Sequence, residues 1–221
     1  HIFFAERGTT KIEPALRRMP LPAPPPSPPP VASVGIVGVG TMGGGIAMSC
    51  LDAGLEVVVV DKDAAALDLG LRRVEASYRK SGAFRRGQLT EDALKRKLAR
   101  LSGSTTMADS AFADVDVAIE AVVESLEVKR AIFAEMEKAC TKDGAVLCSN
   151  TSTLDIDAIA AGVQDTANRS RVAGAHFFSP ANVMKLLENV RGFQEFTAKE
   201  VLLDVYRVLD GKLPQPADAY S

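Results

Sequence analysis

Short runs of apolar residues alternate along this chain with longer segments in which apolar positions recur every three or four residues. The apolar runs predict strands at 34–37, 55–60, 115–122, 145–149 and 172–177. The intervening segments predict helices at 42–53, 64–80, 90–101, 126–140 and 156–161. Strands that are apolar throughout are buried on both faces. We therefore expect an α/β domain over residues 31–190, with a doubly wound, mainly parallel sheet and helices on both of its faces.

The residues on either side of this domain have a different pattern. The segment PLPAPPPSPPP at residues 20–30 predicts an extended linker, because proline fixes φ and removes a backbone donor. The alternative is a ligand for SH3 or WW domains. Residues 1–19 are too short to fold alone and are interpreted as the tail of a preceding module. Residues 191–221 contain one predicted helix, at 198–209.

The composition excludes several classes of function. The chain has 221 residues, with 26 basic and 28 acidic side chains, which gives no electrostatic reason to expect nucleic acid or an anionic membrane as partner. No apolar run reaches the roughly 18 residues of a membrane helix. The three cysteines (Cys50, Cys140 and Cys148) show neither metal-ligand spacing nor a disulfide framework, so we expect no metal and a reducing compartment.

A glycine-rich turn follows the first predicted strand. VGIVGVGTMGGG places Gly38, Gly40 and Gly43 in the spacing G-x-G-x-x-G, between a strand and a helix. This arrangement allows a tight turn and a close approach of a pyrophosphate to the backbone, where the amides of Thr41 and Met42 are also available. The motif predicts a dinucleotide site and a Rossmann-type fold.

The second predicted strand ends at Asp61, 18 residues after Gly43. A carboxylate at this position accepts hydrogen bonds from the adenine-ribose hydroxyls and repels a 2′-phosphate, which favours NAD over NADP. The alternative interpretation is an ordinary turn residue at the end of a strand.

The only internal histidine, His176, lies at the carboxyl end of a predicted strand, the edge at which parallel sheets bind their ligands. A neutral imidazole there can accept the proton of a substrate hydroxyl as hydride leaves the same carbon. Glu188 interrupts a second apolar run 12 residues later and could orient the ring, since a buried carboxylate needs a partner. The alternative is a histidine with a structural role.

Five segments together resemble the NAD-binding domain of L-3-hydroxyacyl-CoA dehydrogenases: GVGTMGGGIA, VVVVDKD, IEAVVESLEVK, CSNTSTLDI and HFFSPANVMKLLE. The resemblance covers residues 31–190 and is greatest to peroxisomal bifunctional enzymes, in which an enoyl-CoA hydratase/isomerase module precedes this domain. It implies NAD-dependent oxidation of 3-hydroxyacyl-CoA in fatty-acid β-oxidation, and a peroxisomal location. The mitochondrial matrix and the cytoplasm are the alternatives.

The resemblance also implies roles for individual residues. His176 would be the general base, Glu188 its orienting partner, and Ser152 a hydrogen-bond donor to the substrate oxygen. Asn150 would lie near the nicotinamide, and the cofactor would be contacted by Glu124 and Lys129. A projecting helical hairpin would contact the acyl-CoA, with Ser77 at the substrate and two arginines, Arg85 and Arg86, near its phosphates. The hairpin lies in the basic stretch between Arg72 and Arg100. Without the resemblance, this stretch would be interpreted as a solvated helical face.

The chain departs from the family at two places. Ser179 stands where single-function members usually have Asn. We also expect the helical second domain that closes over the substrate in this family to be missing from residues 1–221. We therefore expect residues 1–221 to bind NAD but to turn over poorly, because hydride transfer requires exclusion of water. The competing interpretation is a non-catalytic NAD-binding or crystallin-like protein of the same fold.

Overall fold

The structure of the chain is a computed structural model that describes residues 30–108, 110–184 and 186–192. The predictions for residues 1–19, for the linker at 20–29 and for the helix at 198–209 lie outside these residues. No helix in the described part of the chain is both long and apolar enough to span a bilayer.

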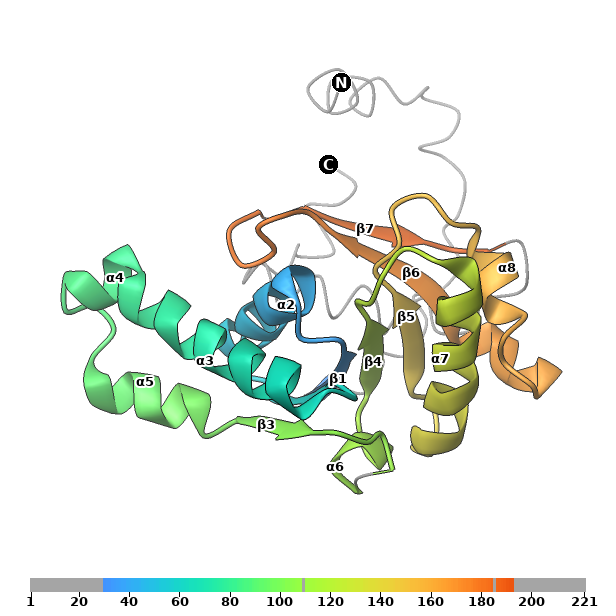
Figure 1. Cartoon of the computed structure of the whole chain (residues 1–221), viewed down its shortest axis with the longest axis horizontal. Coiled ribbons are helices and arrows are strands. Elements are labelled where there is room, and N and C mark those ends of the chain that lie inside the picture. Colours follow the sequence, from blue (N-terminus) through green and yellow to red (C-terminus); the bar gives the residue numbers. More distant parts are fainter. Residues whose placement is uncertain (1–29, 109, 185, 193–221) are drawn as a thin grey trace, which may run out of the picture.

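One sheet organises the described residues, with strands in the order β3-β2-β1-β4-β5-β6-β7 (Figure 1). Six strands run parallel, and β7 runs antiparallel to β6. The chain moves outward from β1 in one direction to β3 and then in the other from β4, so the strand order reverses between β1 and β4. This is the doubly wound order that the sequence predicts, and the predicted fold class is confirmed. The strands are β1 (Ser33–Val37), β2 (Glu56–Val60), β3 (Leu101–Ser104), β4 (Val117–Glu120), β5 (Val146–Ser149), β6 (Val172–Phe177) and β7 (Leu187–Val190).

Helices cover both faces of the sheet (Figure 1). The first face is covered by α2 (Thr41–Asp52), α3 (Ala64–Lys80) and α5 (Glu91–Leu98), with α4 (Gly82–Arg85) between the last two. The second face is covered by α6 (Ser110–Ala113), α7 (Leu126–Ala139) and α8 (Ile156–Ala160), and a 3₁₀ helix (Thr166–Arg171) precedes β6.

The helices on both faces of the sheet explain why the central strands are apolar at most positions. Successive side chains of a strand point to opposite faces. In β2, Val57 and Val59 belong to the core under α2 and α3, whereas Val58 and Val60 belong to the core that contains α7. Both sets are buried, so an alternating polar pattern would leave unpaired polar groups in one core.

The helices α3, α4 and α5 form a hairpin that projects from one edge of the sheet in Figure 1. Arg79 of α3 joins its two arms through two hydrogen bonds of 2.8 Å to the carboxylate of Glu91. The predicted helix 90–101 is too long, because α5 ends at Leu98 and Leu101 begins β3. The segment LSGS lacks the apolar run of the central strands, and it becomes a strand through backbone pairing with β2.

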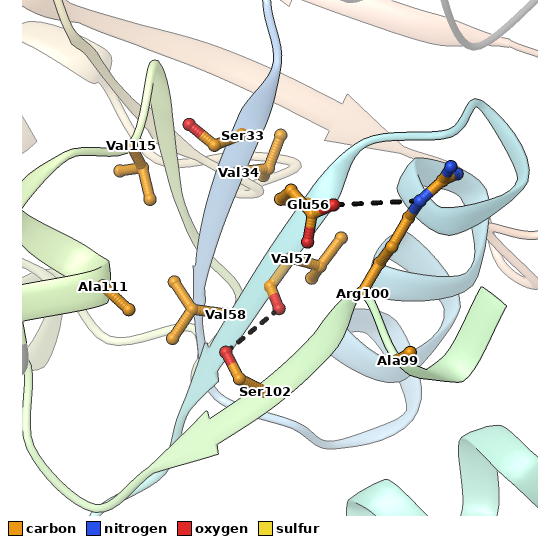
Figure 2. Close-up of a pocket in the computed structure, with 10 residues that line it drawn as sticks. All are labelled: Ser33, Val34, Glu56, Val57, Val58, Ala99, Arg100, Ser102, Ala111 and Val115. Atoms are coloured by element: carbon orange, nitrogen blue, oxygen red, sulfur yellow. Dashed lines mark hydrogen bonds and ion pairs between the residues drawn. The ribbon is translucent and has the colours of Figure 1, made fainter. Parts of the chain in front are cut away.

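A cavity of about 170 Å³ lies where β1, β2 and the start of β3 meet α6 (Figure 2). Its rim carries the ion pair between Arg100 and Glu56, with 3.8 Å between Nε and Oε1. Ser33 and Glu56 are the first residues of β1 and β2, so this cavity lies at the amino ends of the strands. The glycine turn and His176 lie at the opposite, carboxyl edge of the sheet, where the candidate site must be sought.

Candidate functional site

The turn between β1 and α2 is built to bring backbone close to a ligand. Gly38 adopts φ +92°, and a Cβ on Gly43 would overlap the carbonyl oxygen of Gly38. Gly40 precedes α2, has no side-chain cap, and has nothing within 4 Å of the position of a Cβ. The first amides of α2, at Thr41 and Met42, lack intrahelical acceptors and are open to an anion.

Asp61 lies beside this turn, directly after β2. Its carboxylate accepts a long hydrogen bond from the Val39 N–H, at 3.4 Å, and one from the Asp63 N–H, at 3.2 Å. The side chain is half-buried. The carboxylate is thus fixed at the carboxyl end of β2, where the adenine ribose of a dinucleotide lies in this topology.

The predicted pair of His176 and Glu188 is formed. The two residues are direct cross-strand partners in β6 and β7, and Nδ1 of the histidine lies 2.9 Å from Oε2 of the glutamate. An ionised carboxylate only accepts hydrogen bonds, so in a neutral imidazole this contact places the proton on Nδ1 and leaves the lone pair on Nε2. The Phe178 ring packs against the imidazole with 4.6 Å between centroids.

Asn150 directly follows β5 and is hydrogen-bonded to the ends of β4 and β6. Its backbone N–H donates to the carbonyl oxygen of Glu120 at the end of β4, at 2.8 Å. Its side-chain oxygen accepts from the N–H of Phe177 at the end of β6, also at 2.8 Å. Ser152 follows two residues later, with an exposed side chain. The ends of β4, β5 and β6 therefore present Asn150, Ser152 and His176 at one edge of the sheet.

A buried ion pair lies directly beneath this edge. Glu120 of β4 is 0% exposed and Lys129 of α7 is 1% exposed. The Lys129 Nζ is 2.7 Å and 2.8 Å from the two carboxylate oxygens of Glu120. Glu120 also accepts hydrogen bonds from the Ser149 hydroxyl, at 2.6 Å, and from the Val122 N–H, at 2.7 Å. Both oxygens of this carboxylate are thus fully satisfied.

Glu124 extends this network to the surface. Its Oε2 lies 3.2 Å from Lys129 Nζ, and its Oε1 accepts from the Thr151 hydroxyl and from the Ser152 N–H. Partial burial disfavours the charged form, but the hydrogen bond from Thr151 and the Lys129 ammonium outweigh it and hold the pKa of Glu124 below its usual value. An ionised Glu124 therefore fixes the loop that carries Ser152.

The sequence matches the family described as 3-hydroxyacyl-CoA dehydrogenase, NAD binding domain, over residues 33–214. The chain belongs to this family.

Two proteins with sequences similar to this chain have names that refer to fatty acid beta-oxidation or to a CoA-thioester dehydrogenase. A peroxisomal fatty acid beta-oxidation multifunctional protein of Arabidopsis thaliana is 38% identical over 208 residues, which are 94% of this chain and 27% of the plant protein. The 3-hydroxyadipyl-CoA dehydrogenase of Escherichia coli (strain K12) is 42% identical over 191 residues, 86% of this chain and 38% of the relative. The chain thus spans about a quarter of the plant protein's length.

The fold agrees with a solved dehydrogenase of the same kind. The crystal structure of 3-hydroxybutyryl-CoA dehydrogenase from Escherichia coli K12 superposes with a TM-score of 0.72 at 39% sequence identity. The match covers 82% of this chain and 37% of that chain. The resemblance inferred from the sequence motifs is therefore confirmed at the level of the family.

NAD is the cofactor of this domain, and the residues present fit it. The uncapped start of α2 and the open space at Gly40 accommodate a pyrophosphate. Asp61 lies where the adenine-ribose hydroxyls need an acceptor. The described residues contain no group of three or more His, Cys, Asp or Glu side chains that could hold a metal ion.

The structure places the other predicted residues in two groups. Glu124, like Asn150 and Ser152, lies at the edge next to His176, but Lys129 is buried under that edge and reaches it only through Glu124. Ser77, Arg85 and Arg86 lie on the projecting hairpin, and their side chains are exposed. The Ser77 hydroxyl donates to the Arg73 carbonyl oxygen at 2.7 Å.

Sequence reasoning missed Glu120. The signal was present, because a carboxylate inside the apolar run 115–122 needs a buried partner, the argument applied to Glu188. Its partner Lys129 lies on the following helix and was interpreted only through the family resemblance.

Proposed function

We propose that this chain is the NAD-binding, catalytic part of an enzyme that oxidises 3-hydroxyacyl-CoA to 3-oxoacyl-CoA in fatty-acid β-oxidation. The observation that carries the proposal is the His176–Glu188 pair at the carboxyl edge of a sheet that also presents the glycine turn. The names of the plant and bacterial relatives support the class of substrate.

In the proposed reaction, Nε2 of His176 accepts the proton of the substrate 3-hydroxyl. The C3–H bond breaks with its electron pair, and a C=O double bond forms at C3. NAD supplies the acceptor for that hydride. Glu188 holds Nδ1–H, orients the ring and stabilises the imidazolium that results. The Ser152 hydroxyl donates to the substrate oxygen, and Asn150 holds the nicotinamide end of the site.

The projecting hairpin is proposed to hold the coenzyme A part of the substrate. Arg85 and Arg86 lie at its tip and are exposed. By contrast, the charge of Arg79 is already paired, with Glu75 and Glu91. Arg85 and Arg86 form no ion pair among the described residues, so their charges can attract the phosphates of the nucleotide.

We propose that a helical second domain completes the site. His176 retains 19% and Glu188 52% of their side-chain exposure, so water reaches the reacting groups in this chain. Exposed apolar side chains nearby, Val183, Met184 and Leu186, would be covered by such a domain. This chain alone is expected to bind NAD and to turn over slowly.

The wider context is proposed from the plant relative. Its printed name supports a peroxisomal location and a multifunctional chain. We propose that a hydratase/isomerase module precedes this domain in that chain, as the resemblance of the sequence motifs implies. The bacterial relative shows that related proteins also occur in an organism without peroxisomes.

The test is steady-state NADH oxidation by the full-length protein with acetoacetyl-CoA as substrate. We expect turnover with the thioester and at least a hundredfold lower kcat/KM with free acetoacetate, because the hairpin contacts are then lost. Equal rates with the two substrates, or turnover unaffected by His176→Gln, would contradict the proposal.

A further inference from the structure

The ion-pair network of Glu120, Lys129 and Glu124 contains two carboxylates and one ammonium, and so carries one net negative charge. We propose that this charge lies beside the nicotinamide ring and favours the oxidised, positively charged ring over the reduced, neutral ring. Glu120 then determines which redox form of the cofactor binds better, although its side chain is buried. The inference rests on NAD binding in the orientation proposed above.

The orientation follows from the topology. Asp61 marks the adenine-ribose half of the site at the end of β2. The other half of the dinucleotide crosses the switch point between β1 and β4 and lies over the ends of β4 and β5. Glu124 is in the loop after β4, and its Oε1 is bonded to Thr151 in the loop after β5. The network therefore ends in the nicotinamide half.

The distances show that the ammonium of Lys129 pairs more closely with Glu120 than with Glu124. Lys129 Nζ lies within 2.8 Å of both oxygens of Glu120 but contacts one oxygen of Glu124, at 3.2 Å. The pair with Glu120 is in the core, whereas the Glu124 side chain is 40% exposed. Glu120 thus compensates most of the ammonium charge, and the uncompensated negative charge remains on Glu124, at the surface.

Removing the charge of Glu120 would change which carboxylate compensates the ammonium of Lys129. Lys129 would then be compensated by Glu124 alone, and the network would be neutral at the surface. A cation nearby would lose an attraction that is strong in a partly desolvated site, while a neutral ring would lose little. A residue that cannot touch the cofactor would in this way change its redox preference.

The test compares the dissociation constants of NAD⁺ and NADH, measured by isothermal titration calorimetry with the full-length protein. In Glu120→Gln, we expect the ratio Kd(NAD⁺)/Kd(NADH) to rise about threefold or more. In the double variant Glu120→Gln plus Lys129→Met, Glu124 is again an unpaired anion, and the ratio should return toward the wild-type value. A merely structural role would not produce this reversal.

Two further variants complete the experiment. Glu124→Gln removes the same charge without entering the core, so it should raise the ratio even if the Glu120 variants fail to fold. Glu127→Gln removes one charge from the exposed face of α7 and should leave the ratio unchanged. An unchanged ratio in folded Glu120→Gln and Glu124→Gln overturns the inference. Loss of binding of both cofactor forms by the wild type would instead overturn the proposed function.

Discussion

Glu188 lies directly opposite His176 in the antiparallel pair of β6 and β7, with 2.9 Å between Oε2 and Nδ1. The register of this pair decides the contact. Because side chains alternate along a strand, a shift by one residue would turn Glu188 to the other face. The contact of these two residues, which we propose to be catalytic, is therefore a property of strand pairing, and no helix contributes a residue to it.

Replacing either member of this pair should lower kcat with little effect on NAD affinity. For His176→Gln we expect a loss of about 10²–10⁴ in kcat, the usual contribution of a general base. Glu188→Gln should cost less, because the ring keeps a hydrogen-bond partner. Steady-state NADH oxidation with acetoacetyl-CoA measures both effects, and calorimetry measures the affinity for NAD.

Asn189→Ala is the matched control on the same strand, since Asn189 is exposed and pairs with Ala175 rather than with His176. It should retain activity near the wild-type level. A loss as large as that of Glu188→Gln would mean that any change in β7 impairs the site.

Two adjacent glycines of α2 should respond in opposite ways to alanine. A Cβ on Gly43 would overlap the Gly38 carbonyl, and we expect Gly43→Ala to lower the free energy of unfolding by about 2–3 kcal/mol. A Cβ on Gly44 would meet its nearest atom, Cγ2 of Val74, at 3.7 Å. Gly44→Ala should be neutral or stabilise by up to about 1 kcal/mol, because alanine favours a helix.

Urea denaturation of the two variants checks this expectation. Equal stabilities would show that the turn can move away from α2 without cost.

Asp61→Ser should weaken the discrimination between NAD⁺ and NADP⁺. Removing the carboxylate removes both an acceptor for the ribose hydroxyls and a repulsion of the 2′-phosphate. We expect the ratio of the two dissociation constants to shift at least tenfold toward NADP⁺. Asp63→Ser is the control, because serine can still cap α3 and the residue is exposed. A similar shift in that variant would assign the effect to overall charge.

Charge reversal at the tip of the hairpin should weaken acyl-CoA binding and leave NAD binding unchanged. For Arg85→Glu plus Arg86→Glu we expect at least a tenfold higher KM for acetoacetyl-CoA, and a smaller difference at high salt because of screening. Lys138→Glu, on the exposed face of α7, should not change KM. An unchanged KM in the arginine variant would exclude the hairpin turn from the substrate site.

Much of this architecture is predictable because apolar periodicity reports burial. The helix at 64–80 and the strand at 172–177 were predicted with the bounds that the structure shows. The contact of His176 with Glu188 was also predicted, but the burial argument behind it does not hold, because the Glu188 side chain is 52% exposed and the contact comes from strand pairing.

The remainder depends on contacts that leave no local pattern. β3 is a strand because its backbone pairs with β2, whereas its side chains, two of them serines, carry no strand signal. The pairing of Glu120 with Lys129 joins a strand to the following helix. Glu120 interrupts an apolar run, but nothing in the sequence identifies Lys129 as its partner. Such partners are identified only when the packing of α7 on the sheet is known.

The edge position of β7 has a consequence for how the protein would fail on heating. Among the described residues, β7 has a hydrogen-bonded neighbour only in β6, whereas β1, β2, β4 and β5 each have two. Strands with fewer neighbours open at a lower free energy than the whole domain. Glu188 would leave His176 while the glycine turn and Asp61 stay in place. Thermal inactivation should therefore precede both the loss of cofactor binding and the unfolding of the central sheet.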